Sequence, residues 1–254
     1  MLHRGQVYNS GLSYHPDDDF AAYELYAIAE AANITVASGK ADEWAWTGSL
    51  SHIFKQGDSA SRPTITASGA LGKECLTFDG TNDRMAARDS GDTGDRTIAD
   101  FMDTGGVCTM FVVVYVTGVA NNAINPYEND AIITDDNGGT WGLMLRNSAT
   151  PIYRPWGWDG NADSISGLEI ATGTGYILTY RKPDTDAMYG SLNGGAESSV
   201  ANGSIATTAN FDIGDSGLAA PFNGELYMVA GTKTALSAGA AATIAASLKS
   251  YYRI

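Results

Sequence analysis

The sequence predicts an all-β fold in which two antiparallel sheets stack as a sandwich, and three observations favour this class. Four short segments alternate apolar and polar residues and then run into Gly, Asn or Asp, as half-buried strands followed by tight turns do. The chain contains 30 Gly and only 7 Pro. With 44% hydrophobic and 17% charged residues among 254, it can bury a large core in one domain. The four segments are RPT (62–64), FDGTNDRM (78–85), FDIGD (211–215) and FNGELYMV (222–229).

The N-terminal part of the chain does not follow a strand pattern. Residues 1–16 mix Gly, Ser, Asn and Tyr without a period, which predicts an extended arm. Asp17 to Asp19 then precede apolar residues at helical spacing, and acidic side chains suit a helix start, so we expect a helix of about 14 residues that Asn33 ends. These features divide the chain into an attachment segment, residues 1–33, and a sandwich domain, residues 34–254.

Short strands separated by turns follow from residue 34 onward. The nearly continuous apolar run over residues 107–116 predicts a central strand that is covered on both faces. Long loops are expected at 89–103, 117–130 and 147–167, and a closing helix within 235–254, with Ser237 as its cap. The other predicted strands are 34–37, 43–46, 74–78, 131–134, 141–146, 176–181, 188–192, 211–213 and 224–229.

The net charge limits the classes of partner. The chain carries 15 Lys and Arg against 29 Asp and Glu, for a formal charge of −14. Nucleic-acid affinity depends on counterions that Lys and Arg release, so nucleic acid is not an expected partner, and membrane insertion is not expected because no apolar run approaches the roughly 20 residues of a spanning helix. Cys75 and Cys108 are expected as reduced thiols on buried strands, and a disulfide is the alternative.

The order of the motifs also resembles a known family. A strand leads to Trp44 or Trp46, then to Arg62, Pro63 and Thr64, and the next strand ends in Phe78, Asp79 and Gly80. Later come the Asn193-Gly194 and Ile213-Gly214 turns, the segment 222–224, and a C-terminal helix that finishes in Tyr-Tyr-Arg-Ile. This order resembles the laminin G-like domains of the concanavalin A-like lectins, which occur in bacterial surface proteins and bacteriophage virion proteins. The resemblance implies a two-sheet jelly roll in which Phe78 and Phe222 are core residues and Asp79, Gly80, Gly194, Gly214 and Asn223 form turns.

Catalytic motifs do not accompany this fold. A glycanase needs two carboxylates that face the scissile bond. Relatives of this fold that cleave β-glucans place them in an E-x-D-x-x-E run, which the sequence lacks. There is also no G-x-S-x-G, and His3, His15 and His52 are not set among plausible catalytic partners. We therefore expect a protein that is not an enzyme, with a glycan lyase or hydrolase of unrecognised site as the least favoured hypothesis.

Calcium is the one cofactor that the resemblance raises, because related domains often hold an ion at the sandwich rim. Asp135, Asp136 and Asn137 bunch in a predicted loop and could supply oxygen ligands, but they lack EF-hand spacing. Solvated turn acids are the other interpretation. Asp79, Asn82 and Asp83 are a second, weaker candidate.

One predicted loop has the composition of a sugar-binding surface. Aromatic rings stack on sugar C–H bonds, and amide, carboxylate and guanidinium groups bind hydroxyls. Packing at the sandwich edge or against a neighbouring subunit is the alternative explanation of the same aromatic residues. The candidate residues are Tyr153, Arg154, Trp156, Trp158, Asp159 and Asn161.

Two functional hypotheses remain. The first is a noncatalytic structural protein of a bacteriophage head or tail, made in the host cytoplasm because residues 1–10 lack a signal-peptide pattern, and attached to other virion proteins through its N-terminal arm. It would assemble there as a homo-oligomer, with its acidic surface keeping copies apart. The second is a carbohydrate-binding module that recognises bacterial surface glycans.

Overall fold

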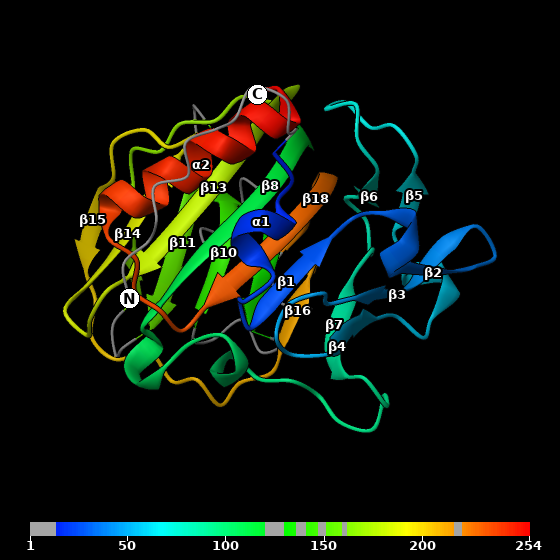
Figure 1. The fold of residues 1–254 in the computed structure, drawn as a ribbon, viewed down its shortest axis with the longest axis horizontal. Coiled ribbons are helices and arrows are strands. Elements are labelled where there is room, and N and C mark those ends of the chain that lie inside the picture. The colour runs from blue at the N-terminus through cyan, green and yellow to red at the C-terminus, as the bar shows by residue number, and fades with distance from the viewer. Residues whose placement is uncertain (1–13, 120–129, 136–140, 147–150, 159–161, 216–219) are drawn as a thin grey trace.

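The strands of the protein form two stacked antiparallel layers, which confirms the predicted fold class (Figure 1). The computed structural model describes residues 14–119, 130–135, 141–146, 151–158, 162–215 and 220–254. The first sheet has the order β15-β14-β13-β8-β18, followed by β6 and β1 side by side along β18, and then β5 beside β6. Its strands are β1 (Leu25–Ile28), β5 (Thr64–Thr66), β6 (Cys75–Asp79), β8 (Cys108–Gly118), β13 (Thr174–Lys182), β14 (Ala187–Leu192), β15 (Ser198–Ala201) and β18 (Asn223–Thr232).

The second sheet has the order β2-β3-β4-β7-β16-β9-β10-β11-β12. A single pairing of Lys40 in β3 with Thr64 in β5 joins the two layers at one side, and β17 (Ala220–Pro221) runs parallel to β9. The strands of this sheet are β2 (Ile34–Ala37), β3 (Lys40–Ala45), β4 (His52–Lys55), β7 (Met85–Asp89), β9 (Asp130–Asp135), β10 (Trp141–Arg146), β11 (Ile152–Trp158), β12 (Ala162–Ser164) and β16 (Phe211–Ile213).

Two hydrophobic clusters stabilise these layers, and β8 contributes to both. Val112 and Val114 point between the sheets, whereas Phe111 and Val113 point to the opposite face. That face lies under α2 (Ala238–Tyr252), which crosses the first sheet in Figure 1. The apolar run that predicted a strand covered on both faces is explained by this arrangement. The Ser237 hydroxyl caps α2 by accepting a hydrogen bond from Ala240 N, as expected.

The predicted N-terminal helix is wrong in length. Only Asp17–Phe20 are helical, as α1, and β1 follows, antiparallel to β18. Leu25 and Ala27 face the inter-sheet cluster, while Tyr26 and Ile28 face the α2 side. A short strand that is buried on both faces is a continuous apolar run, and such a run cannot be distinguished from a helix segment by its sequence pattern, which explains the error. The sandwich therefore begins before the expected boundary at residue 34, and residues 1–13 of the arm lie outside the described part of the chain.

Three predicted strands have the expected bounds: β2, β10 and β16. The expected loop at 147–167 is wrong where it covers β11 and β12, which pair with each other. Pro155 and Gly157 lie within β11 and gave that segment the composition of a turn. The other strands that the sequence pattern missed are β4, β5, β7, β15 and β17. The remaining helical segments are short 3-10 turns at Ala31–Asn33, Ser59–Ser61, Ile98–Asp100 and Thr104–Gly106.

The motif residues have the structural roles that the resemblance implied. Phe78 and Phe222 are buried, with ring centroids 5.8 Å apart. The Asp79 carboxylate accepts a hydrogen bond from Thr81 N at 2.8 Å, and Asn223 pairs with Asp79 at the start of β18. Gly80, Gly194 and Gly214 all have positive φ.

Candidate functional site

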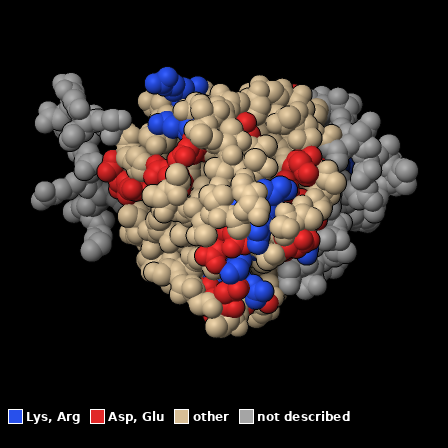
Figure 2. Space-filling model, turned by 90° about the vertical axis from the view of Figure 1, so that its right-hand side faces the viewer, with Lys and Arg blue, Asp and Glu red and all other residues tan. Residues whose placement is uncertain are grey.

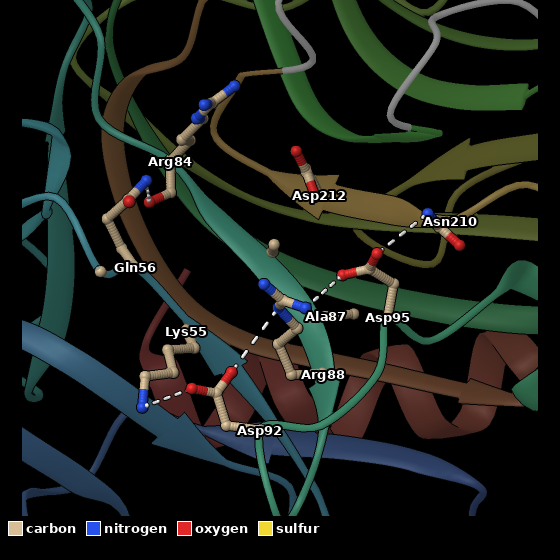
Figure 3. Close-up of a pocket in the computed structure, with 11 residues that line it drawn as sticks. Lys55, Gln56, Arg84, Ala87, Arg88, Asp92, Asp95, Asn210 and Asp212 are labelled. Carbon is tan, nitrogen blue, oxygen red and sulfur yellow. Dashed lines mark hydrogen bonds and ion pairs between the residues drawn. The ribbon is translucent and has the colours of Figure 1, made fainter.

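A cavity of about 440 Å³ opens on the outer face of the second sheet. We call it the β7 cavity. Its polar lining residues are Lys55, Arg84, Arg88, Asp92, Asp95, Asn210 and Asp212 (Figure 3). Ala86 and Ala87 also line the cavity, so charged and amide side chains surround a small apolar part.

Strand alternation explains why these residues face outward. Met85 and Ala87 of β7 are buried against the inter-sheet core, so Ala86 and Arg88 lie on the other face. The register then aligns Lys55 of β4 with Ala86, and Ala86 with Asp212 of β16. The row continues through Thr134 to Gly142, which are both buried. The open part of this face therefore lies over β4, β7 and β16.

Ion pairs fix most of the cavity's charged groups. Lys55 Nζ lies 2.8 Å from Glu43 Oε1 and 3.1 Å from Asp92 Oδ2, and these contacts raise the pKa of the ammonium group. Arg88 Nη1 lies 2.7 Å from Asp95 Oδ1, and its Nε lies 3.7 Å from Asp92 Oδ1. Both aspartates therefore hold cations in place along one wall.

The loop that carries these aspartates is itself tightly bonded. The Asp89 carboxylate accepts hydrogen bonds from Thr93 N at 2.8 Å and Thr93 Oγ1 at 2.7 Å, which lower its pKa. Asn210 Nδ2 donates to Asp95 Oδ2 at 3.4 Å from the residue that precedes β16. This wall is consequently preorganised, with donors and acceptors at fixed positions.

Oppositely charged side chains alternate over the side of the molecule formed by β2 to β5 and β7. Figure 2 shows red and blue groups interleaved in one band rather than segregated. Arg62, from the RPT motif, belongs to this network: its Nη2 lies 2.5 Å from Asp42 Oδ1, and its Nε donates to Gln56 O at 2.7 Å. The motif arginine is therefore a structural residue that holds the segment beside the cavity.

A second cavity, of about 490 Å³, lies between the C-terminal end of α2 and residues 28–32 and 67–74. We call it the Tyr251 groove. Lys73 Nζ lies 3.8 Å from the centroid of the Tyr251 ring, and Glu74 Oε2 accepts a hydrogen bond from Ala31 N at 2.8 Å. Burial and the nearby Glu30 raise the pKa of Tyr251. One face of this aromatic ring is thus already occupied by a cation.

The predicted sugar-binding residues do not form one surface loop. Tyr153 is fully buried in the inter-sheet core, a correction to its expected exposure, because it pairs with Leu145 on the inner face of β11. Arg154 is partly exposed, and burial together with Arg146 lowers its pKa. Trp156 and Trp158 lie in β11, where they pair with Gly142 and Ala162, respectively. Asp159 and Asn161 lie outside the described residues.

Only one of the three predicted calcium ligands lies in the described part of the chain. Asp135 is buried at the end of β9, paired with Phe211, whereas Asp136 and Asn137 lie outside the described residues. In the second candidate, Asp79 and Asp83 accept backbone hydrogen bonds within their own turn. Within the described ranges, no three His, Cys, Asp or Glu side chains are grouped so that they could hold a metal ion.

Both cysteines, and the two histidines that the structure describes, lie in contact with other parts of the fold. Cys75 in β6 and Cys108 in β8 are buried free thiols. His15 Nε2 lies 3.0 Å from Glu30 Oε1, and His52 packs on Trp46 with burial lowering its pKa. None of the described helices is both long and apolar enough to span a membrane.

Comparisons with known proteins define the fold but not a family. No protein-family model matches the chain, and a search of curated proteins finds no significant match. Among solved structures, domain 4 of AbnA, an extracellular arabinanase from Geobacillus stearothermophilus solved with arabinotriose, is similar with a TM-score of 0.60 and 12% identity, over 89% of this chain and 100% of that one.

Two other groups of structures share the fold. The binding domain of botulinum neurotoxin serotype G gives a TM-score of 0.56 at 12% identity, covering 88% of this chain and 50% of that chain. Trypanosoma rangeli sialidase, solved with the inhibitor DANA, gives a TM-score of 0.55 at 10% identity, and the match covers 87% of this chain and 32% of the sialidase chain. This chain therefore spans about half or less of these two longer proteins. At such identities the likeness establishes the two-sheet sandwich architecture alone.

Proposed function

We propose that the protein is a noncatalytic saccharide-binding module and that the β7 cavity is its ligand site. The observation that carries this proposal is a cavity whose donors and acceptors are both held by ion pairs between the sheet and the loop that follows β7. Sugar hydroxyls donate and accept hydrogen bonds at once, so a site that offers carboxylates beside guanidinium groups suits them. The similar arabinanase domain, which was solved in complex with arabinotriose, also supports saccharide binding.

The cavity's carboxylates favour binding over catalysis. Glycoside hydrolysis requires one carboxyl that keeps its proton for the leaving group and a second that is ionised. Asp92 and Asp95 each contact a cation of the protein itself. Both carboxylates are therefore engaged in a preformed wall, which suits a binding role.

The strand that carries Trp156 and Trp158, β11, belongs to the same sheet as the strands of the β7 cavity. Trp156 pairs with Gly142, Gly142 with Thr134, and Thr134 with Asp212. Three strand intervals of about 4.8 Å place these backbone positions roughly 14 Å apart. An oligosaccharide that starts in the β7 cavity could be long enough to reach the strand that carries both tryptophans.

The test is a glycan array that includes bacterial surface polysaccharides, probed with wild-type protein and two matched variants. Ala86→Trp places a large ring at a lining residue of the β7 cavity, and Ala31→Trp places the same side chain in the Tyr251 groove. We expect Ala86→Trp to abolish the glycan signal and Ala31→Trp to retain it, with both variants melting as folded proteins. The reverse result would move the site to the Tyr251 groove, and an array without any wild-type signal would refute saccharide binding.

A second arm of the array examines the residues that the sequence singled out. Trp156→Ala and Trp158→Ala should weaken binding to long glycans more than to disaccharides if β11 contributes to the site. If both variants leave every signal intact, these tryptophans do not belong to it.

We also propose that the module is displayed on a bacteriophage particle, with residues 1–13 attaching it to other virion proteins. The fold supports a display role because the chain leaves the arm on the α2 side, where Tyr14 and His15 contact Tyr251. The β7 cavity lies on the outer face of the other sheet and stays open when the α2 side is attached. Co-sedimentation of the full chain with purified virions, which a variant lacking residues 1–13 should lose, tests this placement. No co-sedimentation of the full chain would count against it.

A further inference from the structure

Of the three cations in the β7 cavity, Arg84 differs from the other two. Lys55 contacts Glu43 and Asp92, and Arg88 contacts Asp95 and Asp92. The Arg84 side chain is exposed, and its guanidinium makes no ion pair with any carboxylate in the described part of the chain. The cavity therefore combines a neutralised wall with one cation that is open to a ligand.

The backbone of Arg84 is nonetheless held firmly. Arg84 N donates to Ser61 O at 2.9 Å, and Gln56 Nε2 donates to Arg84 O at 3.2 Å. These bonds attach the residue to the segment that Arg62 anchors. The guanidinium thus extends from a fixed point at the cavity wall, which lowers the entropy that a ligand contact would cost.

The position of Arg84 separates it from the neutralised wall. In Figure 3 its side chain points away from Arg88, Asp92 and Asp95. Asp212, which also lines the cavity, is only 9% exposed. An anionic group at Arg84 would consequently be kept apart from the two exposed aspartates, while neutral hydroxyls could bind along the wall that carries them.

We propose, on the basis of the saccharide-binding function above, that the β7 cavity selects acidic saccharides and that Arg84 binds their carboxylate. A planar guanidinium donates two parallel hydrogen bonds to a carboxylate, which Lys cannot reproduce. The overall charge of −14 repels acidic polymers from most of the surface, so binding depends on this local cation. The Arg88–Asp95 pair and Asn210 bind the neutral hydroxyls of the same ligand.

Calorimetric titration of the full chain with matched ligands tests the proposal. The probes are oligogalacturonate, hyaluronan fragments and sialyllactose, each beside its carboxyl methyl ester, together with neutral oligosaccharides from the array. We expect an acidic probe to bind about tenfold or more tightly than its ester, since a hydrogen-bonded charge pair contributes at least that factor. Arg84→Gln should remove this preference, and Arg84→Lys should restore only part of it.

Lys249→Gln is the matched control, because it changes the net charge equally on the exposed side of α2. Equal loss of affinity in Arg84→Gln and Lys249→Gln would show a general charge effect and overturn the proposal. Equal affinity for acid and ester, or binding of neutral probes alone, would also overturn it while leaving saccharide binding intact. If neither acidic nor neutral probes bind, both the selectivity and the saccharide-binding function are wrong.

Discussion

Replacement of Gly214 by Ala should destabilise the sandwich more than the same replacement at another left-handed glycine. Gly214 follows β16 with φ of 91°, and a Cβ there would overlap the Phe78 ring and lie 2.6 Å from Asp83 O. Gly39, in the turn between β2 and β3, has a similar φ of 80° but no atom within 4 Å of its Cβ position. Gly39→Ala therefore measures the backbone cost alone, and Gly214→Ala measures that cost together with overpacking.

The backbone cost and the overpacking cost of these replacements differ enough in free energy to be measured separately. A left-handed alanine costs about 1 kcal/mol, and overpacking a filled core adds about 1–3 kcal/mol. We expect Gly39→Ala to lower the free energy of unfolding by about 1 kcal/mol and Gly214→Ala by about 2–4 kcal/mol. For a domain of this size the melting temperatures should fall by about 2–4 °C and about 4–16 °C, respectively. Urea unfolding and thermal melting measure both, and equal losses would refute the close contact between Phe78 and Gly214.

The remaining predictions concern buried titratable groups. Burial raises the pKa of Asp83, so the folded state holds that proton more tightly, and this stabilisation is lost as the pH rises through the raised pKa. Asp83→Asn should therefore gain stability relative to wild type as the pH rises above about 4, the ordinary pKa of Asp, in urea unfolding; a difference that does not change with pH would contradict it. Burial also raises the pKa of Cys75 to about 11 and raises that of Cys108. Both thiols should react with a disulfide reagent only after denaturation, and a thiol that reacts rapidly in the native protein would show that its strand is not buried.

The sequence allowed the architecture to be predicted because its turn chemistry is local. Glycines at 80, 194 and 214 and the alternation around Phe78 and Phe222 mark strand ends without reference to distant residues. The missed strand β1 shows the limit of this reasoning. Its four residues are buried by two different clusters, and only pairing with β18, about 200 residues away, distinguishes a strand from a helix there.

The candidate site could not be predicted in the same way. Lys55, Ala86 and Asp212 are neighbours only because the registers of β4, β7 and β16 align them. Arg84 lies inside the FDGTNDRM segment, but its turn signature gave no indication that the arginine borders a cavity. The aromatic segment at 153–161 carried the stronger compositional signal, yet Tyr153 is a core residue. Composition alone does not reveal which face of a strand a side chain occupies.

Backbone amide chemical shifts of the full chain, recorded while a saccharide from the array is added, test the proposed site most directly. We expect the amides of Gly57, Ala86 and Ala87 to shift until the site is saturated, whereas those of Ala31 and Gly72 in the Tyr251 groove should not shift. Shifts confined to the groove, or none in either cavity at saturating saccharide, would contradict it.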